Sequence, residues 1–252
     1  MSQAMLGKKS IISFMVAMAI IAVVVVTWRW HTPVALLSTN DIVELQVRAI
    51  SGHDTDAAKL LSAAADDGQA MAQRAWGLTL IQHNKVEEGE TWLRRASAQG
   101  DNAARFALGK LYFQGQVVPK DYQQALAWFK PAAEERDASA AYYLGVMYKN
   151  GYGIAIDHVQ AAKWFQVGAD QKQPVSLFML ANAYRDGEGV PQSNPDAVRL
   201  YEQAAELELP EAIQTLAMAY RNGEMGLSRD KGAYLEHVYE IGHSLKHPAL
   251  RP

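Results

Sequence analysis

Four tyrosines recur at an interval of 36 residues, and four glycines recur at the same interval, three positions after each tyrosine. A leucine and an alanine position keep this spacing as well. Self-similarity with a period of about 20 to 50 residues is typical of tandem arrays of short supersecondary units. The four repeated positions are Tyr112, Tyr148, Tyr184 and Tyr220; Gly115, Gly151, Gly187 and Gly223; Leu108, Leu144, Leu180 and Leu216; and Ala125, Ala161, Ala197 and Ala233.

Residues 138–173 show the pattern of one unit most completely. In the first half, Leu144 and Tyr148 stand four residues apart, as the residues on one face of a helix do. Gly151 is expected to end this helix, because glycine accepts the left-handed backbone that a helix C-terminus commonly needs. Asp157 is a good N-cap for a second helix that carries an adjacent tryptophan and phenylalanine. The sequence therefore predicts a helix–loop–helix hairpin.

The other copies vary this pattern at a few informative positions. Pro174 and Pro210 are one interval apart and are expected to open two first helices, where the missing N–H of proline is harmless. Pro131 lies inside a predicted second helix and is expected to kink it or end it early. Val117 and Met225 stand where other copies have a second loop glycine.

The sequence predicts that the chain is divided into four regions. Residues 1–30 are expected to form a cytoplasmic tip and a membrane helix, and residues 31–55 a tether and a first helix. Residues 56–247 are expected to form the repeat array, and residues 248–252 a tail. The array comprises a half-repeat with only a second helix, a short repeat that lacks the glycine-rich loop, full repeats near 102–137, 138–173 and 174–209, and a degenerate last repeat at 210–247.

The pattern resembles the Sel1-like repeat, a relative of the tetratricopeptide repeat. The resemblance is carried by Ala-x-x-x-Leu-Gly-x-x-Tyr-x-x-Gly-x-Gly and Ala-x-x-Trp-Phe-x-x-Ala-Ala, quoted most completely at residues 140–169. It implies an all-α solenoid, a stack of hairpins that curves into a superhelix and binds along its inner surface. The residues that resemble this repeat make up roughly four fifths of the chain.

The N-terminal segment predicts a membrane anchor. Residues 11–28 form an uncharged run of eighteen residues, preceded by Lys8 and Lys9. Trp28 and Trp30 at its end fit the aromatic belt of a membrane surface. This length is at the lower limit for spanning a bilayer, and no small-residue cleavage site follows. We favour an uncleaved single-pass anchor in a bacterial inner membrane, with the repeats in the periplasm, over a cleaved signal peptide. Arg29 on the far side weakens the predicted orientation.

Composition excludes several kinds of chemistry. With 24 basic and 27 acidic residues, the chain lacks the charge excess of a nucleic-acid binder. It has no cysteine, and therefore no thiol nucleophile or disulfide. We find no phosphate-binding loop, serine-hydrolase elbow or zinc-protease motif, and expect no enzyme activity, cofactor or small-molecule substrate.

One pair of histidines and one group of glutamates are interpreted as structural features and not as binding or catalytic sites. His243 and His247 stand four apart and could chelate zinc, but no further ligand is near them in sequence, and a helix end favours positive charge. Glu87, Glu88 and Glu90 are interpreted as the solvated start of a helix.

Candidate partner contacts lie on the predicted first helices, at positions that differ between copies. The position after the repeated tyrosine is cationic in three copies and suits an acidic protein surface, although an ordinary solvated helix position is the competing interpretation. Aromatic residues on the same helices are candidate anchors, or alternatively inter-repeat packing. The candidates are Arg105, Lys110, Phe113, Tyr143, Lys149, Asn182, Arg185 and Arg221.

Three functions remain open. Sel1-like proteins of this size resemble bacterial immunity proteins, which implies a partner such as a phospholipase effector delivered by type VI secretion. The alternative is an adaptor that organises proteins of the cell envelope. A peptidoglycan-modifying enzyme is the third, and the missing acid–base constellation argues against it.

Overall fold

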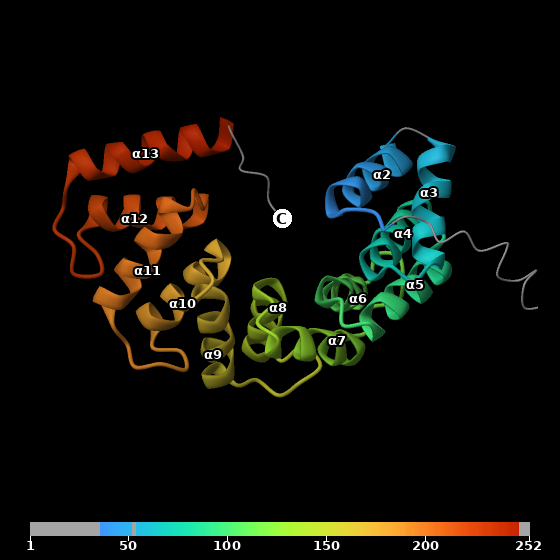
Figure 1. The fold of residues 1–252 in the computed structure, drawn as a ribbon. Helices are drawn as coiled ribbons and strands as arrows, with labels where there is room; N and C mark the ends of the chain where they lie inside the picture. The colour runs from blue at the N-terminus through green and yellow to red at the C-terminus, as the bar shows by residue number, and fades with distance from the viewer. Residues whose placement is uncertain (1–35, 52–53, 247–252) are drawn as a thin grey trace, which may run out of the picture.

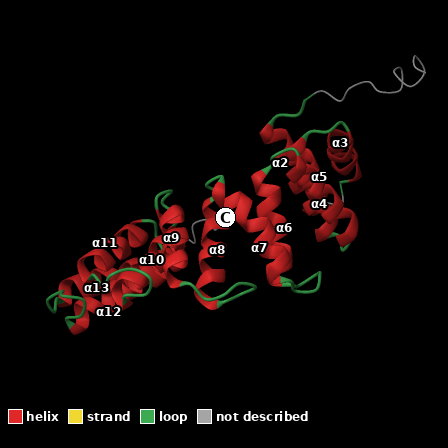
Figure 2. Cartoon of the chain, turned by 90° about the horizontal axis from the view of Figure 1, so that it is seen from below, coloured by secondary structure: helices red, strands yellow, loops and turns green. Residues whose placement is uncertain are grey.

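The computed structural model describes residues 36–51 and 54–246, with side chains described as far as Tyr239. In this part of the chain, twelve α-helices are joined by loops and there is no strand. Figure 2 shows only helices and loops. The helices are α2 (Thr39–Ser51), α3 (Thr55–Asp66), α4 (Ala70–Gln82), α5 (Val86–Ala98), α6 (Asn102–Gln114), α7 (Tyr122–Glu134), α8 (Ala138–Asn150), α9 (His158–Ala169), α10 (Pro174–Asp186), α11 (Asn194–Glu206), α12 (Pro210–Asn222) and α13 (Lys231–Lys246).

The helices form successive hairpins that stack into an open arc, with α2 and α3 at one end and α12 and α13 at the other (Figure 1). From α4 onward each first helix packs against its own second helix, and each second helix packs against the next first helix. The first helices α4, α6 and α8 lie on the inner side of the arc (Figure 1). The prediction of an all-α solenoid is therefore confirmed.

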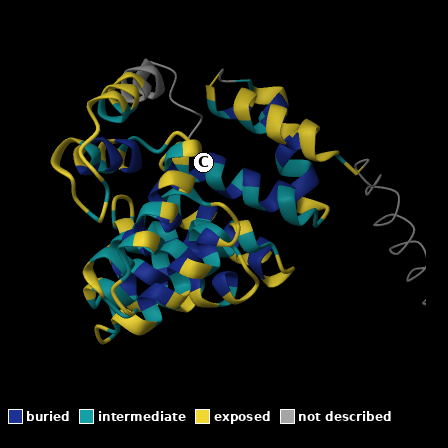
Figure 3. Cartoon of the chain, turned by 90° about the vertical axis from the view of Figure 1, so that its left-hand side faces the viewer, coloured by how far each residue is buried: buried dark blue, intermediate teal, exposed yellow. Residues whose placement is uncertain are grey.

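The repeated positions have the roles that their spacing predicts. The four leucines are at most 2% exposed, and each buried leucine contributes about 1.5–3 kcal/mol by leaving water. Figure 3 shows buried residues along the surfaces where helices meet and exposed residues at the loops. The backbone carbonyl of each repeated tyrosine accepts a hydrogen bond from the N–H of the residue before the second helix, at 2.9–3.0 Å. The same backbone hydrogen bond thus closes the loop in each of the four hairpins that carry the repeated tyrosine.

The expected caps are present. Gly115, Gly151, Gly187 and Gly223 end the first helices with φ between 65° and 74°. The Asp157 carboxylate accepts from the Gln160 N–H at the start of α9. The Ser193 hydroxyl oxygen accepts from the Asp196 N–H and caps α11.

Pro131 does not end its helix early. Helix α7 continues to Glu134, and α11, which lies two intervals later, has the same length of 13 residues. The proline lies in the last turns of α7, where its missing N–H removes a single backbone bond. Buried Phe129 and Ala132 hold this segment against its neighbours, which explains why the helix persists.

Helix α2 precedes the repeats and packs against the first two helices that follow it. Helix α2 packs against both α3 and α4, through the buried side chains Ile42 and Leu45. The apolar residues Val43 and Val47 of the same helix are exposed. Helix α3 therefore has a helical neighbour on each side.

No helix in residues 36–51 and 54–246 combines the length and apolarity that crossing a bilayer requires. The predicted membrane segment, residues 11–28, lies outside the described residues.

Candidate partner-binding surface

The cationic position after the repeated tyrosine lies at the C-terminal end of the first helices. Lys149 Nζ lies 2.7 Å from Glu188 Oε2, and this ion pair joins α8 to the loop of the following hairpin. Arg185 pairs with Asp186 at 2.7 Å, and the Arg221 guanidinium lies 5.8 Å from the centre of the Tyr234 ring. Each of the three cations thus has a neighbour within the chain.

The Arg185 side chain belongs to a larger polar network. The Tyr201 hydroxyl donates to Asn182 Oδ1 at 2.6 Å and accepts from Arg185 at 3.2 Å. The hydrogen bond to Arg185 lowers the pKa of Asp186. Burial raises the pKa of Tyr201 to about 12. Two predicted contact residues, Asn182 and Arg185, are therefore brought together around a fully buried tyrosine.

The predicted anchors Phe113 and Tyr143 belong to an aromatic cluster between hairpins. Their ring centres lie 5.1 Å apart, and Tyr143 stacks on Phe129 at 5.0 Å. The Phe113 ring also makes T-shaped contacts with Tyr122 and Tyr152, with ring centres 5.4 and 5.9 Å apart. These two side chains contribute to packing between repeats, and both remain only half-buried.

Arg105 and Lys110 differ in their surroundings. Arg105 pairs with Glu135 at 2.8 Å, and Asn102 donates to the same carboxylate. These two bonds lower the pKa of Glu135. Lys110 makes no ion pair among the described residues. The predicted contact set is therefore spread along the first helices and does not converge on one point.

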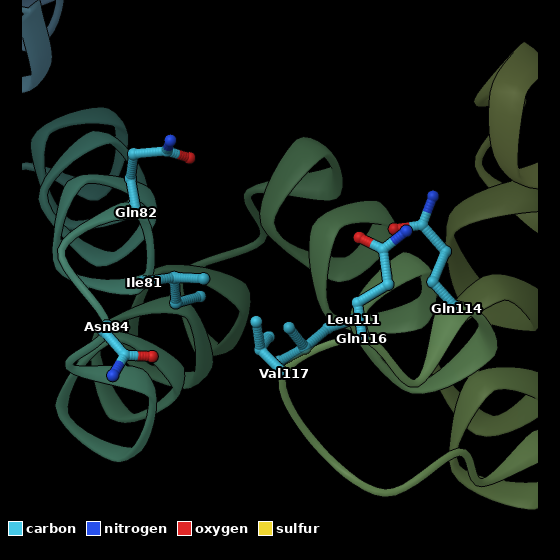
Figure 4. A pocket seen from close by; sticks show the side chains of 7 residues that line it. All are labelled: Ile81, Gln82, Asn84, Leu111, Gln114, Gln116 and Val117. Atoms are coloured by element: carbon cyan, nitrogen blue, oxygen red, sulfur yellow. The ribbon is translucent and has the colours of Figure 1, made fainter.

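A groove of about 350 Å³ lies between the loop end of α4 and the loop after α6 (Figure 4). Ile81 and Val117 point toward one another across it, as Figure 4 shows. Four side-chain amides also line the groove, and none of them makes a hydrogen bond within the described part of the chain. Amide groups both donate and accept, which suits a polypeptide backbone. They belong to Gln82, Asn84, Gln114 and Gln116.

A second groove, of about 290 Å³, lies in the equivalent place near the other end of the array. It is lined by Arg185 of α10, Met218 of α12 and Met225 of the following loop, together with other residues. Met218 is 39% exposed. We call these two cavities the loop-edge grooves.

The loop-edge grooves lie in the two copies where another residue, Val117 or Met225, replaces the second glycine of the loop. Where the glycine is present, the loop packs directly on the preceding second helix, and a Cβ on Gly153 or Gly189 would clash with backbone atoms at 2.9 and 2.0 Å. Val117 and Met225 carry a side chain at this place and line the grooves instead. Met225 keeps the left-handed backbone, with φ of 53°, which is uncommon for a residue other than glycine.

The repeat pattern marks Val117 and Met225 as departures, but it gives no sign of the cavities that they line. Asp101 and Asp137, which cap α6 and α8, were not among the predicted caps. Asp101 in addition pairs with Arg74 at 3.0 Å, largely out of water. The 36-residue spacing of the two aspartates was the signal that could have identified them.

The acidic residues at the start of α5 are partly paired. Glu90 pairs with Arg94 at 2.6 Å and accepts from the Tyr112 hydroxyl. Burial, together with the bond to Glu90, raises the pKa of Tyr112. No group of three or more metal-ligating side chains occurs among the described residues. The side chains of His243 and His247 lie outside them.

Comparisons with solved structures give the same architecture. A Sel1 repeat protein from Oxalobacter formigenes is 26% identical, with a TM-score of 0.72, covering 86% of this chain and 93% of that one. A protective antigen of uropathogenic Escherichia coli, described as displaying an SLR fold, is 27% identical with a TM-score of 0.70. That match covers 81% of this chain, which spans 45% of the antigen.

An immunity protein from Pseudomonas aeruginosa shares the fold at 16% identity and a TM-score of 0.58, covering 85% of each chain. Among curated protein sequences, none matches this chain. The Sel1 repeat model matches residues 72–101, 102–137, 138–172, 174–209 and 210–233, which is more than half of the chain. The chain therefore belongs to the Sel1 repeat family, and its repeats form a scaffold suited to protein–protein interaction.

Proposed function

We propose that this chain is a protein-binding scaffold that neutralises an antibacterial effector, as an immunity protein does. The observation that carries the proposal is the pair of loop-edge grooves, which open where the array departs from its own repeat. One is lined by unpaired amides and the other by exposed methionine. Amides suit a polypeptide backbone, and methionine adapts to varied apolar surfaces.

The choice of an effector as the partner rests on likeness. The family resemblance includes immunity proteins, and one such protein from Pseudomonas aeruginosa has the same fold. In this proposal the effector, such as a phospholipase, binds along the first helices and the loop-edge grooves. Binding would cover its active site or the surface with which it approaches a membrane.

The proposed location is the periplasmic face of a bacterial inner membrane. It is supported by the apolar run of residues 11–28 and by Lys8 and Lys9 before it. Positively charged residues favour the cytoplasmic side of a membrane helix, which would place the repeats on the opposite side. An anchor there would hold the inhibitor where an incoming effector arrives.

The proposal is tested by purifying the full chain from native membranes and identifying bound proteins by mass spectrometry. The candidate effector is then expressed in the periplasm of a sensitive strain, with and without this chain. We expect a stoichiometric complex and restored growth. Restoration by a chain in which both Val117 and Met225 are replaced by glycine would remove the grooves from the proposal, and recovery of envelope proteins without any toxic partner would favour an adaptor.

A further inference from the structure

In the hairpin of α10 and α11, the second helix has no tryptophan at the position where the three preceding second helices have one. Trp92, Trp128 and Trp164 stand at intervals of 36 residues, and the next member of the series is Leu200. The surrounding architecture is the same in each case, because each of these residues lies on a second helix that packs against its own first helix.

The two tryptophans of full hairpins show what this position holds. Trp128 packs against the buried cluster of Leu93 and Leu108, and the Arg94 guanidinium lies 5.1 Å from the centre of its ring. Trp164 packs against the cluster that includes Leu144. The indole Nε1 atoms of both are shielded from solvent.

A groove lies beside Leu200 in the hairpin that lacks the tryptophan. Its volume is about 440 Å³, and residues of α9, α10 and α11 line it. Leu177 and Tyr184 of α10 provide apolar surface. The lining also carries two cations, Lys172 and Arg199, and two carboxylates, Asp170 and Glu206, so it has no excess of positive charge. Shifting Tyr184 and Leu200 back by one interval gives Tyr148 and Trp164, so the groove is the equivalent of the space beside a filled tryptophan position.

We propose that this groove binds an aromatic side chain, an indole above all, from a protein partner. In the two preceding hairpins, the equivalent place is filled by the chain's own indole, from Trp128 or Trp164. The space beside Leu200 should therefore accept a group of the size and shape of an indole. Charge argues for an aromatic ring over an aliphatic group. The electron-rich face of an indole attracts a cation such as Lys172, as Trp128 attracts Arg94, and its N–H can donate to a carboxylate such as Asp170 or Glu206.

This groove is separate from the loop-edge grooves, and the proposal rests only on the family's role in binding proteins. It gives the second-helix side of the array a pocket for one anchoring residue. Aromatic residues are the usual anchors of protein interfaces, where they fill pockets near the centre.

The experiment uses N-acetyl-tryptophanamide as the probe, with the full chain labelled for NMR. We expect saturable shifts in signals of α9, α10 and α11, and much weaker binding of N-acetyl-leucinamide. In Leu200→Trp the chain's own indole fills the groove, so the probe should bind at least about tenfold more weakly while the protein stays folded. Trp164→Leu opens the equivalent place one hairpin earlier and should add a second set of shifts, in α7, α8 and α9.

Three outcomes would overturn the proposal. The first is that neither the wild type nor a folded Trp164→Leu variant binds the probe. The second is equal binding to the wild type and Leu200→Trp. The third is binding that appears only after Trp28 and Trp30 are replaced by alanine, because the occupant would then be this chain itself. None of these results bears on the co-purification that tests the proposed effector.

Discussion

Gly145 faces the ring of Phe165 so closely that a Cβ added to the glycine would lie 2.6 Å from Phe165 Cε1. One interval earlier, Gly109 faces Phe129 in the same way, at 2.5 Å. Both phenylalanines are at most 2% exposed. In these two hairpins the ring of the second helix therefore lies directly on the backbone of the first, and the glycine makes that contact possible.

We predict that Gly145→Ala destabilises the protein. Alanine favours a helix by about 1 kcal/mol over glycine, but overpacking a buried contact costs about 1–3 kcal/mol, and the second effect should prevail here. Urea unfolding of the wild type and the variant measures the difference. In a background with Phe165→Leu the cost should fall by more than half, because the smaller side chain leaves room, and strictly additive effects would contradict the proposed contact.

Gly151→Val should also destabilise the protein, for a different reason. Gly151 has φ of 74°, which a β-branched residue resists, and an added Cβ would meet Ile156 Cγ1 at 2.9 Å. We expect a loss of about 1–3 kcal/mol. Gly100 is the matched control, because it has φ of 87° but open space around it. Gly100→Val should therefore lower the melting temperature less than Gly151→Val does.

The hydrogen bonds of Tyr201 predict a stability cost for Tyr201→Phe. This change removes the hydroxyl that donates to Asn182 and leaves a half-buried acceptor without its partner. The cost should be about 1–2 kcal/mol, measured by urea unfolding at neutral pH. Replacing Asn182 with valine, the residue at this position one interval earlier, in the Tyr201→Phe background should recover part of the loss. A neutral effect of Tyr201→Phe would show that the network adds no stability.

The raised pKa of Tyr201 predicts a pH dependence at alkaline pH. Burial raises this pKa from 10.0 to about 12, so the folded state holds the proton more tightly than the unfolded state does. The contribution is fully present below pH 10 and is lost as the pH rises toward 12. For a shift of this size it amounts to about 2–3 kcal/mol at most. The stability difference between wild type and Tyr201→Phe should therefore shrink between pH 10 and 12, and a constant difference would contradict the shift.

The sequence predicted those features of the fold that depend on the period. The repeated tyrosines and glycines located the hairpins, because one loop geometry recurs in every full copy and requires a positive φ at its glycine. Pro131 was expected to kink its helix or end it early, and the expectation of an early end was wrong because a local rule about proline took no account of the buried Phe129 beside it. The contact surface was less predictable. Ion pairs such as Lys149 with Glu188 join residues 39 positions apart, and the grooves depend on how two loops fail to pack.

Charge reversal tests the cationic position on the first helices. Replacing Lys149, Arg185 and Arg221 together with glutamate should weaken partner binding, measured by titration calorimetry with the co-purified partner. Because Lys149 and Glu188 are paired, part of any stability loss reflects that pair, which at such exposure contributes about 0.2–1 kcal/mol. Adding Glu188→Lys should restore that part.

The matched control for this charge reversal lies on the second helices. Lys59, Lys130 and Lys163 are exposed there, and replacing them with glutamate changes the net charge equally. If the control weakens binding as much as the first set does, the effect is one of net charge and the cationic position has no specific role.

Met225→Gly separates binding from stability at one loop-edge groove. Glycine removes the strain of a positive φ but adds conformational freedom to the unfolded chain, so the two effects should cancel to within about 1 kcal/mol. The same change removes the side chain that lines the groove with Met218 and Arg185. Partner affinity should therefore fall by about tenfold or more, as expected when an apolar side chain is lost from an interface.

The natural comparison for this variant is Gly189→Met, the reverse change in a copy whose loop packs tightly. An added Cβ there lies 2.0 Å from the His158 carbonyl oxygen, so this variant should lose stability without gaining affinity. Urea unfolding and calorimetry on both variants give the two quantities. Unchanged affinity in Met225→Gly would mean that the groove forms only because the loop lacks its glycine, and that the partner binds elsewhere on the array.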